Sequence, residues 1–499
     1  MKGYVLGRLL RSFISIFLVI TLTYIMVFSL VPRRSVFSTD PVYPKMTKTQ
    51  DSRLDYENSI FSLMGYIDYL DSKALQRKAE KTDKSVNVEI NKKNKGIYNK
   101  WAKNKRGYWK IKQFPTSKKF YATREIPLLE RVCRFYGKLI QIDHPWYIHD
   151  KDNPNLKRGY KITNNKIDGF TLIGSGTKYK YQVYFDKHFP FIHQNIIHLY
   201  LGESFPTFAN RKVMDVITNG QGETIASEMT FPTGKKQISP INIHTARYQP
   251  LKKMDNITRA RFGKDFYSKT ENFYQDPSMI AISLKVGLIS LMIAYVLGIP
   301  LAVLMAHFKS SWIDKIGTAS ITLLISIPSL AIIYFLRFIG SSAFGWPDLF
   351  PTLGAQNIFS YFLPTLILAI LNITNTVMWT RRYMIDQQSA DYVKFARAKG
   401  LSEYEISKNH ILKNASIPIV QNVPTMIILT IQGATMTETI FAVPGMGKML
   451  PDAIIVHNNS MVISLVFLFT LLAVIGVFIG DLLMIMMDPR INLSVKGGK

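Results

Sequence analysis

The sequence of 499 residues contains a single cysteine, Cys133. One thiol cannot form an intrachain disulfide, so each folded part of the chain must be stabilised by packing. Paired cysteines and an HExxH motif are also absent, and we predict no metal site. The sequence therefore excludes a disulfide framework and argues against structural zinc.

A nucleotide-binding loop is lacking as well. The segment around Gly169 and Gly174 superficially resembles a phosphate-binding loop, but Ser175 stands where that motif requires lysine. Residues 33–276 contain no clustered nucleophile and base, so a membrane-anchored enzyme, one alternative for this chain, has no recognisable site there. We predict no catalytic residue, no enzymatic activity and no cofactor in this chain.

Acidic residues are few, and the 62 Lys and Arg against 34 Asp and Glu give a formal net charge of +28. Most of the excess lies in residues 33–276, which hold 44 Lys and Arg against 24 Asp and Glu. A basic face suits phosphate binding, but these residues are scattered and accompany no nucleic-acid module. We therefore predict no nucleic-acid partner.

Long apolar runs are the main positive feature of the sequence. A membrane-spanning helix needs about 20 apolar residues, and six segments provide them, at about 9–31, 279–306, 316–339, 358–380, 417–440 and 461–487. The first run is too long for a cleaved signal peptide and lacks a small-residue cleavage site, so we predict a retained helix. The predicted fold class is an all-α polytopic membrane protein with six transmembrane helices and an inserted domain.

The orientation follows from the Lys and Arg of the short loops. With the N-terminus inside, the cytoplasmic segments hold 15 of these residues, whereas the two short outer loops hold only Lys448. We predict that both termini are cytoplasmic. The predicted domains are 1–32 with the first helix, an extracellular domain 33–276, and a membrane core 277–499.

The predicted extracellular domain mixes two kinds of pattern. Residues 57–82 and 125–141 have apolar residues at helical spacing, whereas 159–185 alternates in the manner of strands, with turn signals between them. The stretch 84–112 is rich in Lys and Asn and is predicted to be a long loop. We therefore expect a mixed α and β domain.

The loop 381–416, the longest on the predicted cytoplasmic side, carries the most information. Residues 389–399 suit a helix, Gly400 suits a left-handed helix end, and Ser402 with Glu405 forms a capping box that starts a second helix. Small residues such as Ala396 would leave the first helix narrow enough to enter a groove on another protein. The pattern predicts a rigid projection.

This loop resembles the EAA loop of ABC-importer permeases, particularly those of the dipeptide and oligopeptide branch. The resemblance rests on D-Y-V-x-x-A-R-A-K-G-L, on H-x-L-x-N-A and on the I-P that follows. It implies a type I permease of the bacterial plasma membrane whose coupling helix docks on an ATPase subunit. The residues that match this pattern are Asp391, Ala396, Arg397, Ala398, Lys399, Gly400, Leu401, His410, Asn414 and Pro418.

Three further segments resemble the same family: Leu201–Ser204, Gly298–Leu301 and Glu438–Gly447. The long insertion after the first span resembles the oligopeptide permeases of streptococci and related Gram-positive bacteria. The resemblance implies a second homologous permease, two ABC ATPase subunits that bind ATP and magnesium, an extracellular lipid-anchored peptide-binding protein, membrane lipid and an oligopeptide substrate.

Polar residues inside the predicted spans mark either a pathway or hydrogen bonds between helices, because such groups are costly in lipid. Candidates for a translocation pathway or gate are Asn372, Asn375, Gln432, Thr435, Glu438, Pro444 and Gly445. Helix packing and lipid exposure remain alternatives for the fourth-span residues. For Glu438, the alternative to an outer gate is an interfacial carboxylate paired with a cation.

The sequence therefore predicts a permease subunit of an ATP-driven oligopeptide importer, forming half of the pathway. The alternative is a membrane-anchored signalling or exporter-like component with a large extracellular sensor domain. In that case the projection would transmit a signal rather than couple transport.

Overall fold

The computed structural model describes residues 2–46, 49–80, 92–103, 107–165, 168–186, 191–432 and 435–487. The chain divides into two compact units. Unit 1 comprises Met1–Asp40, Ser204–Ala209 and Ser278–Lys499; unit 2 comprises Pro41–Glu203 and Asn210–Pro277. Two segments that the sequence boundaries assign to the inserted domain, 33–40 and 204–209, therefore belong to the helical unit.

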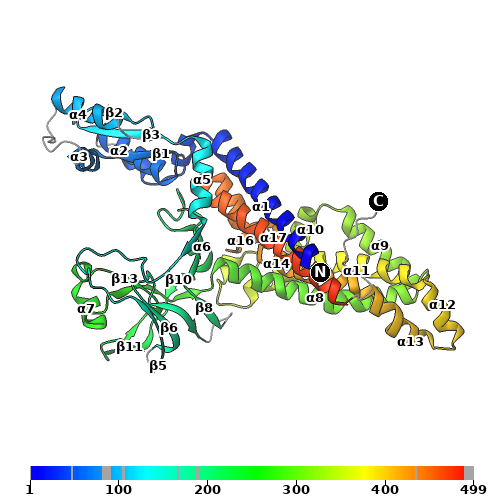
Figure 1. Cartoon of the computed structure of the whole chain (residues 1–499). Helices are drawn as coiled ribbons and strands as arrows, with labels where there is room; N and C mark the ends of the chain where they lie inside the picture. Colours follow the sequence, from blue (N-terminus) through cyan, green and yellow to red (C-terminus); the bar gives the residue numbers. More distant parts are fainter. Residues whose placement is uncertain are drawn as a thin grey trace. The chain divides into compact units, whose positions relative to one another are not determined.

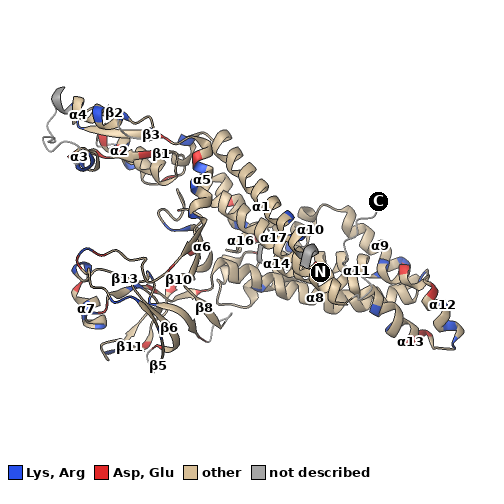
Figure 2. Ribbon diagram, viewed as in Figure 1, with Lys and Arg blue, Asp and Glu red and all other residues tan. Residues whose placement is uncertain are grey.

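Unit 1 is helical, and its described residues contain no strand. Its helices are α1 (Lys2–Leu30), α8 (Met279–His307), α9 (Trp312–Ser326), α10 (Ser329–Phe344), α11 (Phe359–Gln388), α12 (Asp391–Ala398), α13 (Glu403–Ile406), α14 (Lys413–Gln432), α15 (Thr435–Ile440), α16 (Met446–Ile455) and α17 (Asn459–Met487). Figure 1 shows α8, α11, α14 and α17 running alongside one another. In Figure 2 these long helices are mostly tan, and charged residues gather around α12 and α13.

Five stretches among the described residues are long and apolar enough to cross a membrane: Leu6–Leu30, Met279–His307, Phe359–Gln388, Glu403–Ile440 and Asn459–Met487. The predicted third span, 316–339, is instead a pair of helices, α9 and α10, bent by 107°. The break falls at Ile327 and Pro328. Ile327 is extended, because a residue before proline is disfavoured in the helical region. The total is six only if this bent pair forms one span, so the six-helix count stays a prediction.

The helices of unit 1 pack closely where small residues face a neighbour. A Cβ atom on Gly287 of α8 would collide with Thr430 of α14, and one on Gly480 of α17 would collide with the backbone of Gln421. Small residues permit this approach of two helix backbones in membranes, where dispersion contacts and hydrogen bonds drive association. One apolar core of this unit includes Ile282, Ile333, Tyr361 and Phe441.

Unit 2 mixes helices and sheets, so the all-α description applies only to unit 1. Its helices are α2 (Gln50–Leu63), α3 (Ser72–Glu80), α4 (Lys92–Lys103), α5 (Leu128–Leu139), α6 (Val213–Thr218) and α7 (Asn256–Phe262). Its strands are β1 (Ile67–Leu70), β2 (Lys110–Gln113), β3 (Phe120–Glu125), β4 (Ile140–Ile142), β5 (Gly159–Asn165), β6 (Gly169–Ser175), β7 (Tyr181–Phe185), β8 (Ile192–Gln194), β9 (Ile197–Leu199), β10 (Gln221–Thr224), β11 (Ser227–Thr230), β12 (Lys236–Ser239), β13 (Ile241–Tyr248), β14 (Tyr267–Asn272) and β15 (Tyr274–Asp276).

The strands form antiparallel sheets. One sheet has the order β1-β3-β2, a second has the order β5-β6-β7-β8, and the others are two-stranded. The predicted strands of 159–185 are confirmed as β5, β6 and β7. The predicted helix 57–82 is wrong in part, because β1 lies between α2 and α3 and pairs with β3. The predicted loop 84–112 contains α4, whose Tyr98 and Trp101 are buried in an apolar cluster.

Candidate functional site

The helix α12 ends in a left-handed turn at Gly400. The Gly400 amide donates to the carbonyl of Arg397 at 2.9 Å, and the Leu401 amide donates to that of Ala396 at 3.3 Å. These two bonds form a Schellman motif, and φ of Gly400 is +80°. Glycine suits this position because a Cβ atom is disfavoured at positive φ. The predicted helix end is confirmed.

The next helix begins with the predicted capping box. The Glu405 amide donates to Ser402 Oγ, and the Ser402 amide donates to the Glu405 carboxylate at 3.0 Å. Across the turn, the guanidinium of Arg397 binds the carboxylate of Glu403 at 2.8 Å. Residues 391–406, which we call the α12–α13 projection, are therefore held in one conformation by backbone and side-chain bonds.

One side of the α12–α13 projection is buried and the other is exposed. Val393 and Ala396 pack with Met384 of α11 and Ala306 of α8. Ala396 therefore faces the chain's own core, although the sequence interpretation placed it toward a partner. On the exposed side, Phe395 of α12 and Tyr404 of α13 are 71% and 70% accessible. Exposed apolar side chains on a rigid projection are typical of a protein-binding surface.

The other predicted coupling residues divide by exposure. Arg397, Ala398, Lys399, Gly400 and Leu401 are exposed with the projection. Asp391 is also exposed, and the Lys394 ammonium, 2.8 Å away, lowers the pKa of its carboxyl. His410 lies in a π-helical turn, Ser407–Leu412. His410, Asn414 and Pro418 are half-buried along the path into α14.

An ion pair that the sequence analysis missed joins α9 to α11 near this projection. Arg381 binds Asp314 through two nitrogens, at 2.6 and 2.8 Å, and the Asp314 side chain is only 6% exposed. The Ser310 amide donates to the same carboxylate. Two parallel bonds fix orientation as well as distance. The signal available in the sequence was Asp314 itself, an acidic residue at the start of an apolar helix that needs a cationic partner.

A polar cavity of about 330 Å³ lies between α8, α11 and α14. Its lining includes Asn372, Asn375 and Thr376 of α11, with Tyr295 of α8 and Asn422 of α14. Asn372 also donates to Ser290 Oγ at 3.4 Å. The structure thus brings two predicted pathway residues to one cavity, and their role in translocation stays a prediction. Thr374, by contrast, bonds its own helix.

The remaining pathway candidates lie near the end of α15. Thr435 is half-buried at its first position, whereas the side chain of Gln432 lies outside the described residues. Glu438 is 1% exposed and accepts hydrogen bonds from Ser283 Oγ at 2.6 Å and from the Lys448 amide at 3.0 Å. Its donors here are a hydroxyl and an amide rather than a cationic side chain. This carboxylate therefore ties α15 to α8 and to the turn that contains Pro444 and Gly445.

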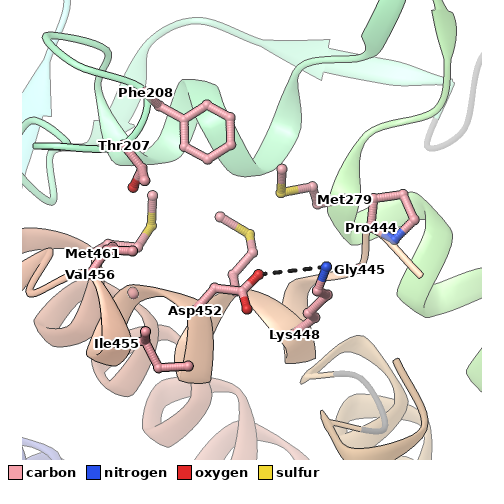
Figure 3. Close-up of a pocket in the computed structure, with 12 residues that line it drawn as sticks. Thr207, Phe208, Met279, Pro444, Gly445, Lys448, Asp452, Ile455, Val456 and Met461 are labelled. Atoms are coloured by element: carbon pink, nitrogen blue, oxygen red, sulfur yellow. Dashed lines mark ion pairs between the residues drawn. The ribbon is translucent and has the colours of Figure 1, made fainter. Parts of the chain in front are cut away.

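A second cavity, of about 420 Å³, opens beside this turn. Figure 3 shows Thr207 and Phe208 on one side and residues of α16 on the other. Its lining consists of Thr207, Phe208, Met279, Pro444, Gly445, Lys448, Met449, Asp452, Ala453, Ile455, Val456 and Met461. Two predicted gate residues, Pro444 and Gly445, therefore border a largely apolar cavity.

Asn458, which the sequence analysis did not single out, holds the segment 204–209 at this cavity. Its amide nitrogen donates to Ser204 Oγ at 2.8 Å and to Thr207 Oγ1 at 2.9 Å. Its oxygen accepts from the amide of Met461 at 3.1 Å. Asn458 is fully buried, so these bonds offset the cost of burying its amide group. No local pattern relates residues more than 250 positions apart.

Among the described residues, no group of three or more His, Cys, Asp or Glu side chains is arranged to hold a metal ion. The features that the structure brings together are a rigid exposed projection, a polar cavity between long apolar helices and an apolar cavity near the α15–α16 turn. They define a membrane transport subunit of the permease class.

Comparisons with known proteins identify the family. Residues 298–493 match the model of the binding-protein-dependent transport system inner membrane component. The oligopeptide transport system permease protein AmiC of Streptococcus pneumoniae is 51% identical over 500 residues, covering 100% of both chains. The dipeptide transport system permease protein DppB of Bacillus subtilis is 30% identical over 43% of this chain and 69% of its own. The chain therefore belongs to the family of binding-protein-dependent peptide transport permeases.

Among solved structures, the MetNI methionine ABC transporter in inward-facing conformations aligns with a TM-score of 0.35 and 16% identity, over 42% of this chain and 94% of that chain.

Proposed function

We propose that the chain is the permease subunit of an ATP-driven importer of oligopeptides and forms half of the translocation pathway. Full-length identity of 51% to an oligopeptide permease supports this substrate class. Small neutral polar groups such as Asn372 and Asn375 suit the pathway, since they offer hydrogen bonds to the backbone of a peptide of any sequence. A second, homologous permease supplies the other half.

The α12–α13 projection transmits the movement of the ATPase subunits to the translocation pathway. The observation that carries this proposal is the exposure of Phe395 of α12 and Tyr404 of α13, on a projection whose other side is packed against α8 and α11. ATP and magnesium bind to two partner ATPase subunits and not to this chain. When ATP brings these subunits together, the two projections move with them, and the paired permeases open outward.

The proposed topology has six spans, with the bent pair α9 and α10 counted as one. Both termini and the projection lie in the cytoplasm, because basic residues cluster in those segments. Unit 2 is extracellular and bears the excess of basic residues. It lies where a lipid-anchored peptide-binding protein would deliver its cargo.

Uptake of a labelled oligopeptide, measured in cells that express the whole transporter, tests this function. Phe395→Asp should abolish uptake, because a carboxylate in an apolar interface is costly to desolvate. Phe395→Leu, which keeps an apolar side chain at the same position, should retain most uptake. Equal uptake by both variants would show that the projection does not couple transport. Intact uptake without ATPase partners would overturn the proposal of an ATP-driven importer.

A further inference from the structure

The apolar cavity beside the α15–α16 turn has the properties of a binding site for varied side chains. Three of its lining residues are methionines, Met279, Met449 and Met461, and all are buried. Methionine is unbranched and polarisable, so a wall of methionines can adapt to ligands of different shape. The volume, about 420 Å³, falls within the range of small-molecule pockets.

A pair of opposite charges borders the same cavity. The Lys448 ammonium and the Asp452 carboxylate lie 3.8 Å apart, and their side chains are 29% and 53% exposed (Figure 3). This separation exceeds hydrogen-bond length, so each ion keeps capacity for another partner. Together they match the carbonyl and amide groups, or the charged ends, of a peptide. A lipid acyl chain brings no polar group to such a pair.

The backbone around the cavity is held in an uncommon conformation. Phe208, Ala442 and His457 have φ values of 51°, 52° and 57°, which residues other than glycine seldom adopt. Such strained backbone conformations are kept only where the surrounding structure holds them, and they are concentrated at ligand-binding sites. Phe208 lines the cavity, and the other two flank its lining segments. The hydrogen bonds of Asn458 fix Thr207 beside Phe208.

We propose that this cavity is a subsite for an apolar side chain of the transported peptide, with Lys448 and Asp452 binding polar groups of the adjoining backbone. The proposal rests on the proposed function and deepens it, because it predicts a preference among peptides that arises in the permease itself. A peptide with an apolar side chain gains contacts here that a polar one of equal length does not.

The test is competitive uptake of two differently labelled pentapeptides by the complete transporter. The pentapeptides are alanine peptides with a central phenylalanine or a central serine. Val456→Trp places an indole in the cavity and should lower the ratio of phenylalanine-peptide to serine-peptide uptake roughly tenfold, the usual size of discrimination by an apolar pocket. Ile454→Trp is the matched control: Ile454 is 57% exposed, does not line the cavity, and should leave the ratio unchanged.

A second variant, Met449→Ala, tests the same proposal if Val456→Trp does not fold. Met449→Ala enlarges the cavity and should raise uptake of a peptide with a central tryptophan relative to one with a central leucine. The external binding protein is the same in every sample, so a changed ratio reports on this chain. Unchanged ratios in both variants would overturn the subsite, as would an equal loss of both peptides, which indicates a lipid or a docking protein in the cavity. Failure of the wild type to transport any peptide would overturn the proposed function itself.

Discussion

The carboxylate of Glu438 accepts a hydrogen bond of 2.6 Å from the hydroxyl of Ser283, and both residues are almost completely buried. The same serine oxygen accepts from the amide of Met446 at 2.8 Å. The pair therefore joins α15 to α8 and fixes the start of α16. Glu438 therefore holds in place the turn that borders the apolar cavity.

Glu438→Ala should lower the free energy of unfolding by about 1–3 kcal/mol, because the Ser283 hydroxyl and the Lys448 amide lose a buried acceptor. Thermal unfolding of the purified protein in detergent measures this loss. Thr439→Ala is the control, since Thr439 is exposed and its hydroxyl bonds only its own helix. A melting temperature equal to that of the control would show that the hydrogen bonds of Glu438 do not stabilise this turn.

Arg381→Ala should destabilise the protein by about 3 kcal/mol, because it leaves the carboxylate of Asp314 buried without its cation. The neighbouring Arg382 lies 5.3 Å from the ring of Trp379, and Arg382→Ala should cost no more than about 1 kcal/mol. Denaturant titration of both variants under identical conditions measures the difference. Equal midpoints would show that the bidentate pair contributes little.

Gly400→Val should lower transport-coupled ATP hydrolysis strongly, because valine at φ +80° costs roughly 1–3 kcal/mol and distorts the end of α12. A Cβ atom there would meet no neighbour, so the effect comes from the backbone and not from a clash. Gly400→Asn should retain more activity, since asparagine tolerates the left-handed region. The measurement is peptide-stimulated ATPase activity of the complete transporter in lipid vesicles. Equal activity of both variants would mean that this turn has no part in coupling.

The stability of the chain should rise with pH between about 8 and about 10.4, owing to Lys178 in unit 2. Burial, followed by the charge of Lys212, lowers the pKa of Lys178 to about 8, whereas a lysine in an unfolded chain has a pKa of about 10.4. Between these values the folded chain has released a proton that the unfolded chain still binds, so raising the pH favours folding. The midpoint of chemical unfolding, followed across this interval, measures the effect.

Lys178→Met should flatten this pH dependence, because it removes the group that titrates differently in the two states. Lys161→Met replaces an exposed lysine on β5 and should keep the wild-type slope. An identical slope in all three proteins would assign the effect to other groups.

Several local features were predictable because their cause lies within a few residues. The positive φ of Gly400 and the capping box of Ser402 and Glu405 depend on neighbouring backbone groups. The strands of 159–185 follow from alternation. In contrast, β1 was missed within a helical pattern because its place is set by pairing with β3, more than 50 residues away. Long-range pairing overrides local preference in such short strands.

By itself the sequence determined the apolar helices, the projection and the family, since run length, turn chemistry and motif spacing are properties of contiguous residues. Only the tertiary structure decided that Asp314 pairs with Arg381, that Asn458 holds residues 204–209, and that three methionines from α8, α16 and α17 meet in one cavity. The tertiary structure also buried Ala396 against α8 and α11, and it bent the third apolar segment at Pro328. These outcomes depend on which helix faces pack together, a choice made by the summed contacts of distant segments.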